Sequence, residues 1–369
     1  MSDRWPEQLM LSAVVGMSIV IAASLTASSR LHQESLGGTV NVGATRAASS
    51  TWQRVLPPEG WHILSFGRGF EDLDTTIDGS VWLAAQHGGV FRMGAESSQV
   101  YGVDTFTRTL RGISMVSPTD GWIAGDDGVP LRFTGERWER AQSPVMDNLR
   151  ATLMDVDMVS ESDGWMCIDK ANIIPPIESN MLRFDGDRWS FHDFPATDNC
   201  FTIHMLSQSY GWVGGSGSLS RFDGVSWASM PSPVEGLISS IDIISPSDVW
   251  AVAGRNFLHF NGEEWLVIPN PSNKEMTAID FVSPNEGWAV GAAIMHYSEG
   301  EWTEVESPVE LDLEKQYLLR LKMISAAEGW AVGTLGLILH YSTDNGGGPG
   351  LAERFDYSAN LPWVGAHAD

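Results

Sequence analysis

The stretch SPNEGWAVG, residues 283–291, decides the fold because close copies of it recur along most of the chain. The copies are SPTDGWIAG at 117, SESDGWMCI at 160, SQSYGWVGG at 207, SPSDVWAVA at 245 and SAAEGWAVG at 325, with a looser one, TIDGSVWLAA, at 76. The seven repeat tryptophans follow each other at intervals of 40, 43, 47, 38, 38 and 42 residues: Trp82, Trp122, Trp165, Trp212, Trp250, Trp288 and Trp330. Such a period is typical of propeller blades.

Each repeat predicts four short strands. A β-favouring run such as TAIDFV (277–282) comes first, and the Ser-Pro type cluster then makes a turn before the repeat tryptophan. A third strand such as IMHYS (294–298) follows, and a hairpin such as FDGDRW (184–189) contains a glycine suited to positive φ. A second tryptophan opens the fourth strand in five repeats: Trp138, Trp189, Trp227, Trp265 and Trp302. Four short strands per repeat make one blade.

The N-terminal part of the repeat region supplies the strand that the last repeat lacks. LILHYS (337–342) runs into a glycine-rich tail, whereas STWQRVLPP (50–58) has the fourth-strand pattern, with Trp52 in the tryptophan position. The sequence therefore predicts an all-β, seven-bladed propeller over residues 50–345, with four-stranded antiparallel blades and the N-terminal strand closing the last blade. The first blade is a degenerate copy, because QVYGV (99–103) replaces its fourth-strand tryptophan. We interpret Trp52 and the seven repeat tryptophans as structural residues between blades, and the acid or glycine before each as shaping the turn.

The segments outside the repeats have different compositions. Residues 9–27 carry no charge over 19 positions, so residues 1–27 are expected to form a hydrophobic helix that is either a signal peptide or a membrane anchor. Residues 28–49 are predicted to be a polar linker, and residues 346–369 a flexible glycine-rich tail. We therefore expect an extracytoplasmic protein that meets a membrane through its N-terminus.

The charge excludes one class of partner. The chain has 47 acidic and 22 basic residues, a formal net charge of −25. So acidic a surface repels phosphate backbones and argues against nucleic-acid binding. Solubility is the simplest explanation of the charge.

The repeats resemble those of a known group of proteins. The pattern Ser-Pro-x-Asp-Gly-Trp-Ala-Val-Gly, followed by ILHY, resembles the BNR or Asp-box-like bacterial propellers and the photosystem II stability or assembly-factor-like propellers. The Asp-box survives in part as Ser342, Asp344 and Gly346, without its tryptophan, and the first repeat is more similar to propeller repeats of two-component sensors. The resemblance covers about residues 50–345 and implies a propeller that binds a protein or glycan partner, in the manner of an assembly factor for a membrane complex. It is specific for architecture, because propellers host many activities.

The rival hypothesis is a carbohydrate-active enzyme, a hydrolase or lyase that uses the central pocket. A sialidase-like site needs three arginines around a carboxylate, but Arg111, Arg150 and Arg320 lie at different distances from their repeat tryptophans. A third hypothesis is a calcium-dependent adhesin. We predict no catalytic residue, no cofactor and no metal site, since the nine histidines show no metal-ligand spacing and no phosphate-binding loop occurs.

The candidate site lies on the face formed by the connections from second to third strands and from fourth strands to the next blade. The third blade has a long insertion there, CIDKANIIPPIESNM (167–181), whose apolar run either contacts a partner or folds down onto the fourth blade. The candidate binding residues on this face are His87, Asp126, Asp127, Asp169, Lys170, Ile173, Ile174, Ile177, Arg255 and Asn256.

Two further features of that face leave alternatives open. Cys167 and Cys200 both lie near it, and in an exported protein we predict that they form a disulfide at the base of the insertion, with two unrelated buried thiols as the alternative. GDDG (125–128) offers two carboxylates to a calcium ion, but two acids without further ligands at fixed spacing are weak evidence, and we favour a solvated turn.

Overall fold

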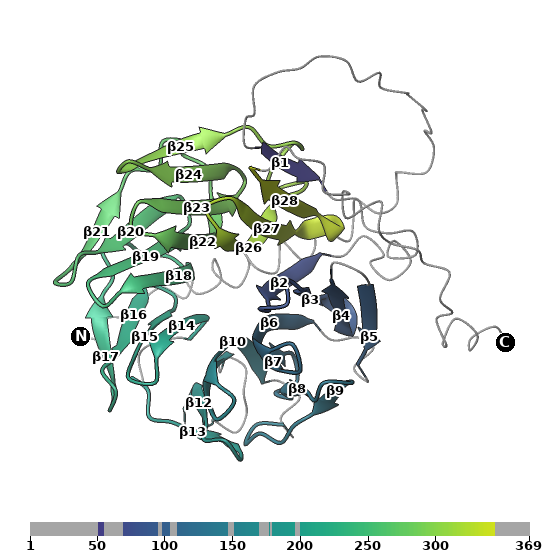
Figure 1. Cartoon of the computed structure of the whole chain (residues 1–369). Helices are drawn as coiled ribbons and strands as arrows, with labels where there is room; N and C mark the ends of the chain where they lie inside the picture. The colour runs from purple at the N-terminus through teal and green to yellow at the C-terminus, as the bar shows by residue number, and fades with distance from the viewer. Residues whose placement is uncertain are drawn as a thin grey trace, which may run out of the picture.

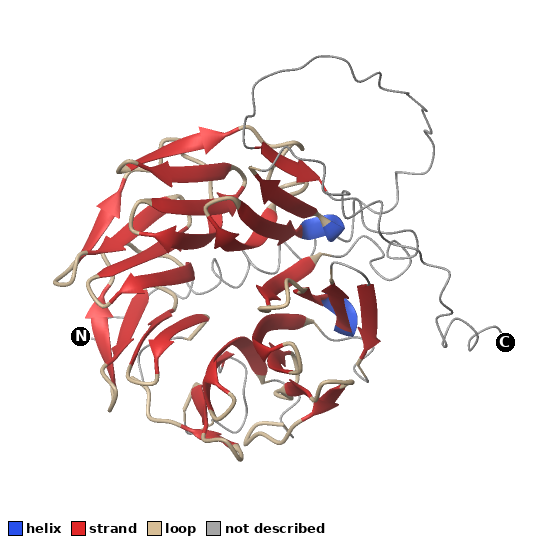
Figure 2. Ribbon diagram, viewed as in Figure 1, coloured by secondary structure: helices blue, strands red, loops and turns tan. Residues whose placement is uncertain are grey.

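Seven four-stranded antiparallel sheets stand around a central axis like the blades of a propeller (Figure 1). The computed structural model describes residues 69–94, 98–103, 109–146, 151–169, 177, 179–195 and 200–343, and the backbone of residues 51–54. The first strand of each blade lies nearest the axis and the fourth lies at the circumference (Figure 1). Apart from two single-turn 3₁₀ helices, the described secondary structure is all strand (Figure 2).

Blades one to four follow each other along the chain. Blade one comprises β2 (Phe70–Thr75), β3 (Val81–Ala85), β4 (Gly89–Met93) and β5 (Ser98–Gly102), with η1 (Gln86–Gly88) between β3 and β4. Blade two comprises β6 (Leu110–Ser117), β7 (Asp120–Gly125), β8 (Leu131–Phe133) and β9 (Trp138–Arg140). Blade three comprises β10 (Thr152–Ser160), β11 (Asp163–Asp169), β12 (Met181–Phe184) and β13 (Trp189–Phe191). Blade four comprises β14 (Thr202–Ser207), β15 (Tyr210–Gly214), β16 (Ser218–Phe222) and β17 (Trp227–Pro231).

The remaining three blades complete the ring. Blade five comprises β18 (Ile238–Ser245), β19 (Asp248–Ala253), β20 (Asn256–Phe260) and β21 (Trp265–Ile268). Blade six comprises β22 (Met276–Ser283), β23 (Glu286–Gly291), β24 (Ile294–Ser298) and β25 (Glu301–Val305). Blade seven comprises β26 (Leu318–Ser325), β27 (Glu328–Gly333), η2 (Thr334–Gly336), β28 (Ile338–Ser342) and β1 (Thr51–Arg54).

The closing strand is where the sequence predicts it. β1 pairs antiparallel with β28, with Trp52 opposite Tyr341, so the fourth strand of blade seven comes from the N-terminal end of the repeat region. This pairing covers the outer edge of β28, which would otherwise offer free backbone groups for association. The seven-bladed, all-β prediction is therefore confirmed.

The local sequence explains why the strands turn where they do. The hairpins between third and fourth strands need a residue with positive φ, and glycine adopts it without strain at Gly186 (φ 95°) and Gly262 (φ 97°). A side chain before this glycine then accepts hydrogen bonds from backbone amides that follow it in the hairpin. Asp223, for example, accepts from the amides of Val225 and Ser226, both at 2.9 Å.

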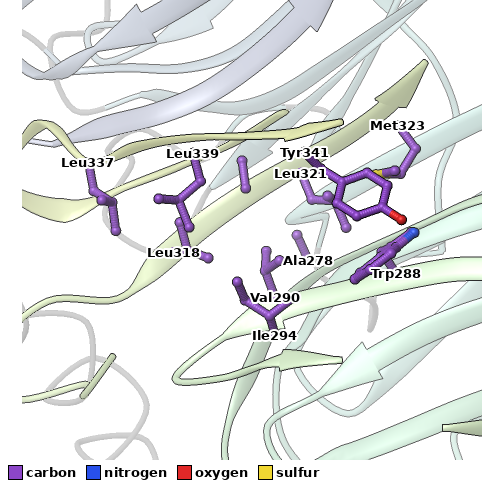
Figure 3. Close-up of a cluster of buried hydrophobic side chains, with 11 residues drawn as sticks. Ala278, Trp288, Val290, Ile294, Leu318, Leu321, Met323, Leu337, Leu339 and Tyr341 are labelled. Carbon is purple, nitrogen blue, oxygen red and sulfur yellow. The ribbon is translucent and has the colours of Figure 1, made fainter. Parts of the chain in front are cut away.

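The apolar core lies between neighbouring blades. Trp288 of blade six packs with Leu318, Leu321 and Tyr341 of blade seven, as Figure 3 shows. Rings from adjacent blades meet edge to face: Trp165 contacts Trp227 with centroids 5.4 Å apart, and comparable clusters occupy the other interfaces. In blade one Tyr101 stacks on Trp82 at 5.7 Å, whereas Ser98, opposite Met93, occupies the register position of the missing fourth-strand tryptophan.

Some predictions fall outside the described residues. They are the hydrophobic helix over residues 1–27, the linker over 28–49 and the tail over 346–369, together with the side chain of Trp52. In the part of the chain that the structure describes, no helix is long and apolar enough to cross a membrane.

Candidate binding face and axial polar rings

The propeller has two distinct faces because its strands alternate in direction. The connections from second to third strands, and those from fourth strands to the next blade, lie together on what we call the loop face. The tight turns between first and second strands, and the hairpins between third and fourth strands, lie on the opposite side, which we call the turn face.

The structure distributes the predicted binding residues around the loop face. They lie in the second-to-third-strand connections of blades one, two, three and five or at the strand ends beside them: His87, Asp126, Asp127, Asp169, Ile177, Arg255 and Asn256. Lys170, Ile173 and Ile174 lie outside the described residues. The described members share a face but come from four blades, so they do not form one compact cluster, and a binding role for them stays a prediction.

The GDDG turn has a structural task. Arg111 Nε donates to Asp126 Oδ1 at 2.9 Å, and the Thr109 amide donates to the other carboxylate oxygen at 3.2 Å. Asp127 adopts φ 70° at the tip of the turn. Among the described residues no group of three or more His, Cys, Asp or Glu side chains is placed to hold a metal ion.

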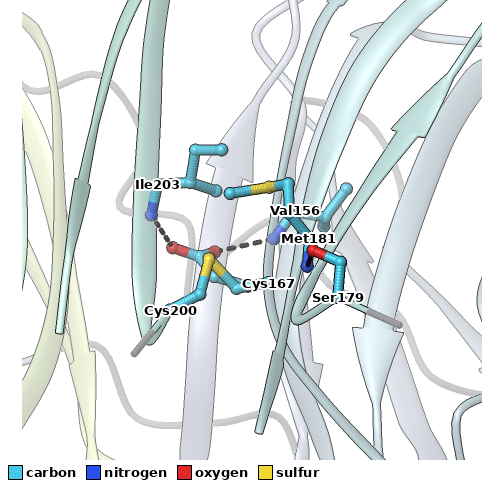
Figure 4. The surroundings of a disulfide bond; sticks show 7 residues. Val156, Cys167, Ser179, Met181, Cys200 and Ile203 are labelled. Atoms are coloured by element: carbon cyan, nitrogen blue, oxygen red, sulfur yellow. Dashed lines mark hydrogen bonds between the residues drawn. A yellow bond between two sulfur atoms is a disulfide. The ribbon is translucent and has the colours of Figure 1, made fainter. Parts of the chain in front are cut away.

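Cys167 and Cys200 are joined by a disulfide with a Cα–Cα distance of 5.0 Å. Cys167 lies on β11 in register with Met181 of β12, the strand that follows the insertion. The bond joins this point to the segment that leads into β14, so it links blades three and four beside Ile203 (Figure 4). Both cysteines are buried.

Polar side chains of the innermost strands lie around the propeller axis, and the sequence interpretation missed them. One polar residue of each innermost strand pairs across the sheet with the repeat tryptophan, and together these form the axial ring: Asp74, Ser114, Asp157, His204, Asp242, Asp280 and Lys322. A second ring, two residues earlier on the same strands, consists of Asp72, Gly112, Asp155, Thr202, Ser240, Ala278 and Arg320.

Most of the axial carboxylates bind the backbone of the next blade. Asp72 and Asp74 accept from the amides of Ile113 and Met115 at 2.8 and 2.7 Å. Asp155 accepts from Ile203 at 2.9 Å and also from Val156 at 2.9 Å (Figure 4). Each innermost strand is the inner edge of its sheet, so its amides need acceptors from outside the sheet.

The same arrangement recurs around the ring. Asp157 accepts from the Met205 amide at 2.6 Å, Asp242 from Phe281 at 2.8 Å and Asp280 from Met323 at 2.5 Å. Ser114 accepts from the Met158 amide at 3.0 Å at the interface of blades two and three. The polar axis is therefore a series of hydrogen bonds between blades.

The innermost strand of blade seven carries the permanent cations of the two rings. Arg320 Nε lies 3.6 Å from Asp72 of blade one, and Lys322 Nζ lies 3.9 Å from Asp280 of blade six. His204 Nδ1 lies 3.3 Å from Asp242 Oδ1. Six axial carboxylates thus face two permanent cations and one histidine.

Burial, together with the excess of acids over cations, raises the pKa values of several of these carboxyls. Burial raises the pKa of Asp72 to about 7 although Arg320 opposes it, and burial raises the pKa of Asp155 to about 6. Burial likewise raises the pKa of Asp280 to about 7 against the attraction of Lys322. Asp280 in turn raises the pKa of Lys322, whose side chain keeps 40% of its surface accessible.

A sequence signal for this ring exists. The residue eight positions before each repeat tryptophan is polar in all seven repeats, as Asp157 before Trp165 and Asp280 before Trp288 illustrate. Among alternating apolar residues such a position looks like the solvated side of a strand. Only the closed ring turns that side toward the axis.

No protein-family profile matches the chain, and no curated protein matches its sequence. Among solved structures, YCF48 bound to a D1 peptide superposes with a TM-score of 0.61 at 15% identity, covering 82% of this chain and 100% of that one. YCF48 from Cyanidioschyzon merolae gives 0.61 at 14% identity over 80% and 99%. The extracellular domain of a putative one-component system from B. thetaiotaomicron gives 0.60 at 12% identity over 79% of this chain and 40% of that one. The chain therefore has the fold of a seven-bladed propeller and is similar in structure to YCF48.

Proposed function

We propose that this chain is a non-catalytic, extracytoplasmic scaffold that binds a polypeptide segment of a partner protein during assembly or stabilisation of a membrane complex. The observation that carries the proposal is the match of the whole propeller to YCF48, of which one solved structure holds a D1 peptide. At 15% identity the match shows a shared fold, and we extend it here to binding of a partner polypeptide.

The use of the axial polar groups supports a scaffold. A catalytic carboxylate must be able to reach a substrate, yet both oxygens of Asp155 accept backbone hydrogen bonds. One carboxylate oxygen of Asp72 accepts from the Ile113 amide, and the other lies beside Arg320 Nε. These contacts make a rigid disc whose loop face can present connections to a partner.

Two observations support an extracytoplasmic location. The Cys167–Cys200 disulfide suits an oxidising compartment, and residues 9–27 form an uncharged apolar stretch near the N-terminus. A fusion of alkaline phosphatase to the C-terminus, active only after export, tests the location directly. An inactive fusion in a well-expressed chain would contradict export.

The raised pKa values of Asp72 and Asp155 beside Arg320 favour a second candidate, a carbohydrate-active enzyme. We rank it second because these carboxyls have structural hydrogen-bond partners. A screen of chromogenic glycosides against the wild type and an Asp155→Asn variant distinguishes the two functions. Hydrolysis that disappears in the variant would support the enzyme.

The scaffold is tested by isolating the tagged full-length protein from gently solubilised membranes of its host. The comparison is a variant that lacks residues 170–176, the apolar part of the blade-three insertion. We expect the wild type to retain a defined membrane-protein complex in stoichiometric amount. Failure of the wild type to retain any protein after crosslinking would overturn the proposal.

A further inference from the structure

A pocket on the loop face lies at blade six, beside the loop that leads to blade seven. It has a volume of about 510 Å³ and is bounded by Lys274, by the connection Ala292–Ala293, by the end of β25 and by the loop 306–311. Apart from the end of β25, all of these belong to second-to-third-strand or blade-to-blade connections, so the pocket opens on the loop face. We call it the blade-six pocket.

The inner part of the pocket is apolar. Ile294 and Ala293 are buried at its base, and Val305, Val309 and Leu311 pack against the core between blades six and seven. This core therefore fixes the base and inner wall. A small apolar side chain entering the pocket would gain contact without rearranging the blades.

The rim of the pocket is acidic. Glu304, Glu306 and Glu310 line it, against the single basic residue Lys274. Lys274 Nζ already donates to Glu304 at 2.7 Å, and Lys315 Nζ donates to Glu310 at 3.0 Å. The lining retains a net charge of −2, from three glutamates and one lysine.

The neighbouring loop is also acidic, and the neighbouring strand has an open backbone edge. The loop 306–317, ESPVELDLEKQY, carries four acids and one lysine. β25 is the last strand of its sheet, so its outward edge presents N–H and C=O groups that the sheet leaves unpaired. An extended polypeptide is suited to such an edge.

From these contacts we infer that the blade-six pocket binds an extended, basic segment of a partner protein, with an apolar side chain in the pocket and flanking lysine or arginine side chains against Glu306 and Glu310. This inference rests on the proposed scaffold function and adds to it a location and a partner chemistry. An acidic segment would meet repulsion from the same rim.

The test uses the full-length protein in detergent and the fluorescein-labelled peptide acetyl-Ala-Lys-Val-Lys-Ala-amide, followed by fluorescence anisotropy. The pocket variant combines Glu306→Lys with Glu310→Lys. The matched control combines Glu263→Lys with Glu264→Lys, two exposed residues in the hairpin of blade five on the turn face, with the same change of charge. Near-ultraviolet circular dichroism of the tryptophans establishes that both variants are folded.

We expect the pocket variant to bind the peptide at least about fivefold more weakly, because two exposed ion pairs are replaced by repulsion. The control should stay within about twofold of the wild type, since screening limits distant charges at 0.15 M salt. The acidic peptide acetyl-Ala-Glu-Val-Glu-Ala-amide should not bind the wild type. Replacing the central valine by glycine should weaken binding further, which separates pocket contact from attraction by charge alone.

Three outcomes would overturn the inference: no binding of the basic peptide to the wild type, equal loss in both variants, or equal binding of the valine and glycine peptides. The membrane experiment separates this failure from failure of the scaffold. If the pocket variant retains the same complex as the wild type, the pocket is wrong and the scaffold stands. If the wild type binds the peptide but retains no complex, the scaffold is wrong.

Discussion

The guanidinium of Arg183 lies over the ring of Trp165, with Cζ 4.8 Å from the ring centroid. Asp163, two residues before the tryptophan, accepts from Arg183 Nε at 3.0 Å and so fixes the cation above the ring. Blade two has the same arrangement: Arg132 lies over Trp122 and donates to Asp120.

Histidine replaces arginine in the last three blades. His259 stacks on Trp250 at 4.3 Å and lies 2.8 Å from Asp248. His296 stacks on Trp288 at 4.1 Å, with Glu286 2.6 Å away. The acid of the repeated phrase therefore holds a third-strand side chain over the tryptophan, a task that the turn interpretation did not include.

Removing the Arg183 guanidinium should lower the stability of the fold. We expect Arg183→Ala to lower the free energy of unfolding by about 1–2 kcal/mol, through loss of a cation–π contact and a charge-assisted hydrogen bond. Arg137→Ala is the control, because Arg137 is 77% exposed and pairs only with an exposed glutamate. Urea unfolding followed by tryptophan fluorescence measures both. Equal midpoints for the two variants would show that the contact contributes nothing.

The glycine before the tryptophan makes room for a large side chain of the first strand. A Cβ at Gly287 would lie 2.4 Å from the ring of Phe281, so we expect Gly287→Ala to cost about 1–3 kcal/mol of unfolding free energy. Blade five has Val249 at this position, opposite Ile243.

This difference offers a compensating pair. Gly287→Val alone should be strongly destabilising, and adding Phe281→Ile, which reproduces the combination of blade five, should recover part of the loss. Thermal unfolding of the two single variants and the double variant forms a double-mutant cycle. Strict additivity would argue against steric coupling between the two positions.

Reduction should destabilise the propeller through a single bond. Cys167 and Cys200 are the only cysteines of the chain, so a reductant acts on one disulfide. The bond closes a loop with a sequence separation of 33, for which we expect a loss of about 2–4 kcal/mol. Urea midpoints with and without a phosphine reductant measure it, and a variant with both cysteines changed to alanine should be insensitive to reductant. An unchanged midpoint in the wild type would contradict the prediction.

The axial carboxyls should make stability depend on pH. An unfolded aspartate has a pKa of about 3.9, whereas burial raises the pKa of Asp155 to about 6 and that of Asp280 to about 7. The folded state then binds more protons between these values, so these groups favour folding at low pH and lose that contribution as pH rises through about 6 to 7.

Asp155→Asn should flatten this dependence, because the amide oxygen can still accept from Ile203 and has no charge to lose. The slope of urea midpoint against pH, between about pH 4 and 7, should fall relative to the wild type. Asp187→Asn, in an exposed hairpin, is the matched control. A slope equal to that of the wild type would contradict the assignment.

The sequence by itself determined the number of blades, their four strands and the closing strand. It could do so because a blade is a local structure: the phrase around Trp288, the glycine of each hairpin and the alternation of apolar residues all act within about 40 residues. Trp52 indicated the closing strand because its surroundings repeat the fourth-strand pattern.

Only the tertiary structure decided what lies on the axis and between blades. Asp74 meets the Met115 amide and Arg320 meets Asp72 because closure of the ring brings separate repeats into register. The blade-six pocket likewise depends on the positions of three connections that are separate in the sequence. Periodicity fixes the structure within a repeat, whereas the contacts between repeats follow from the geometry of the closed ring.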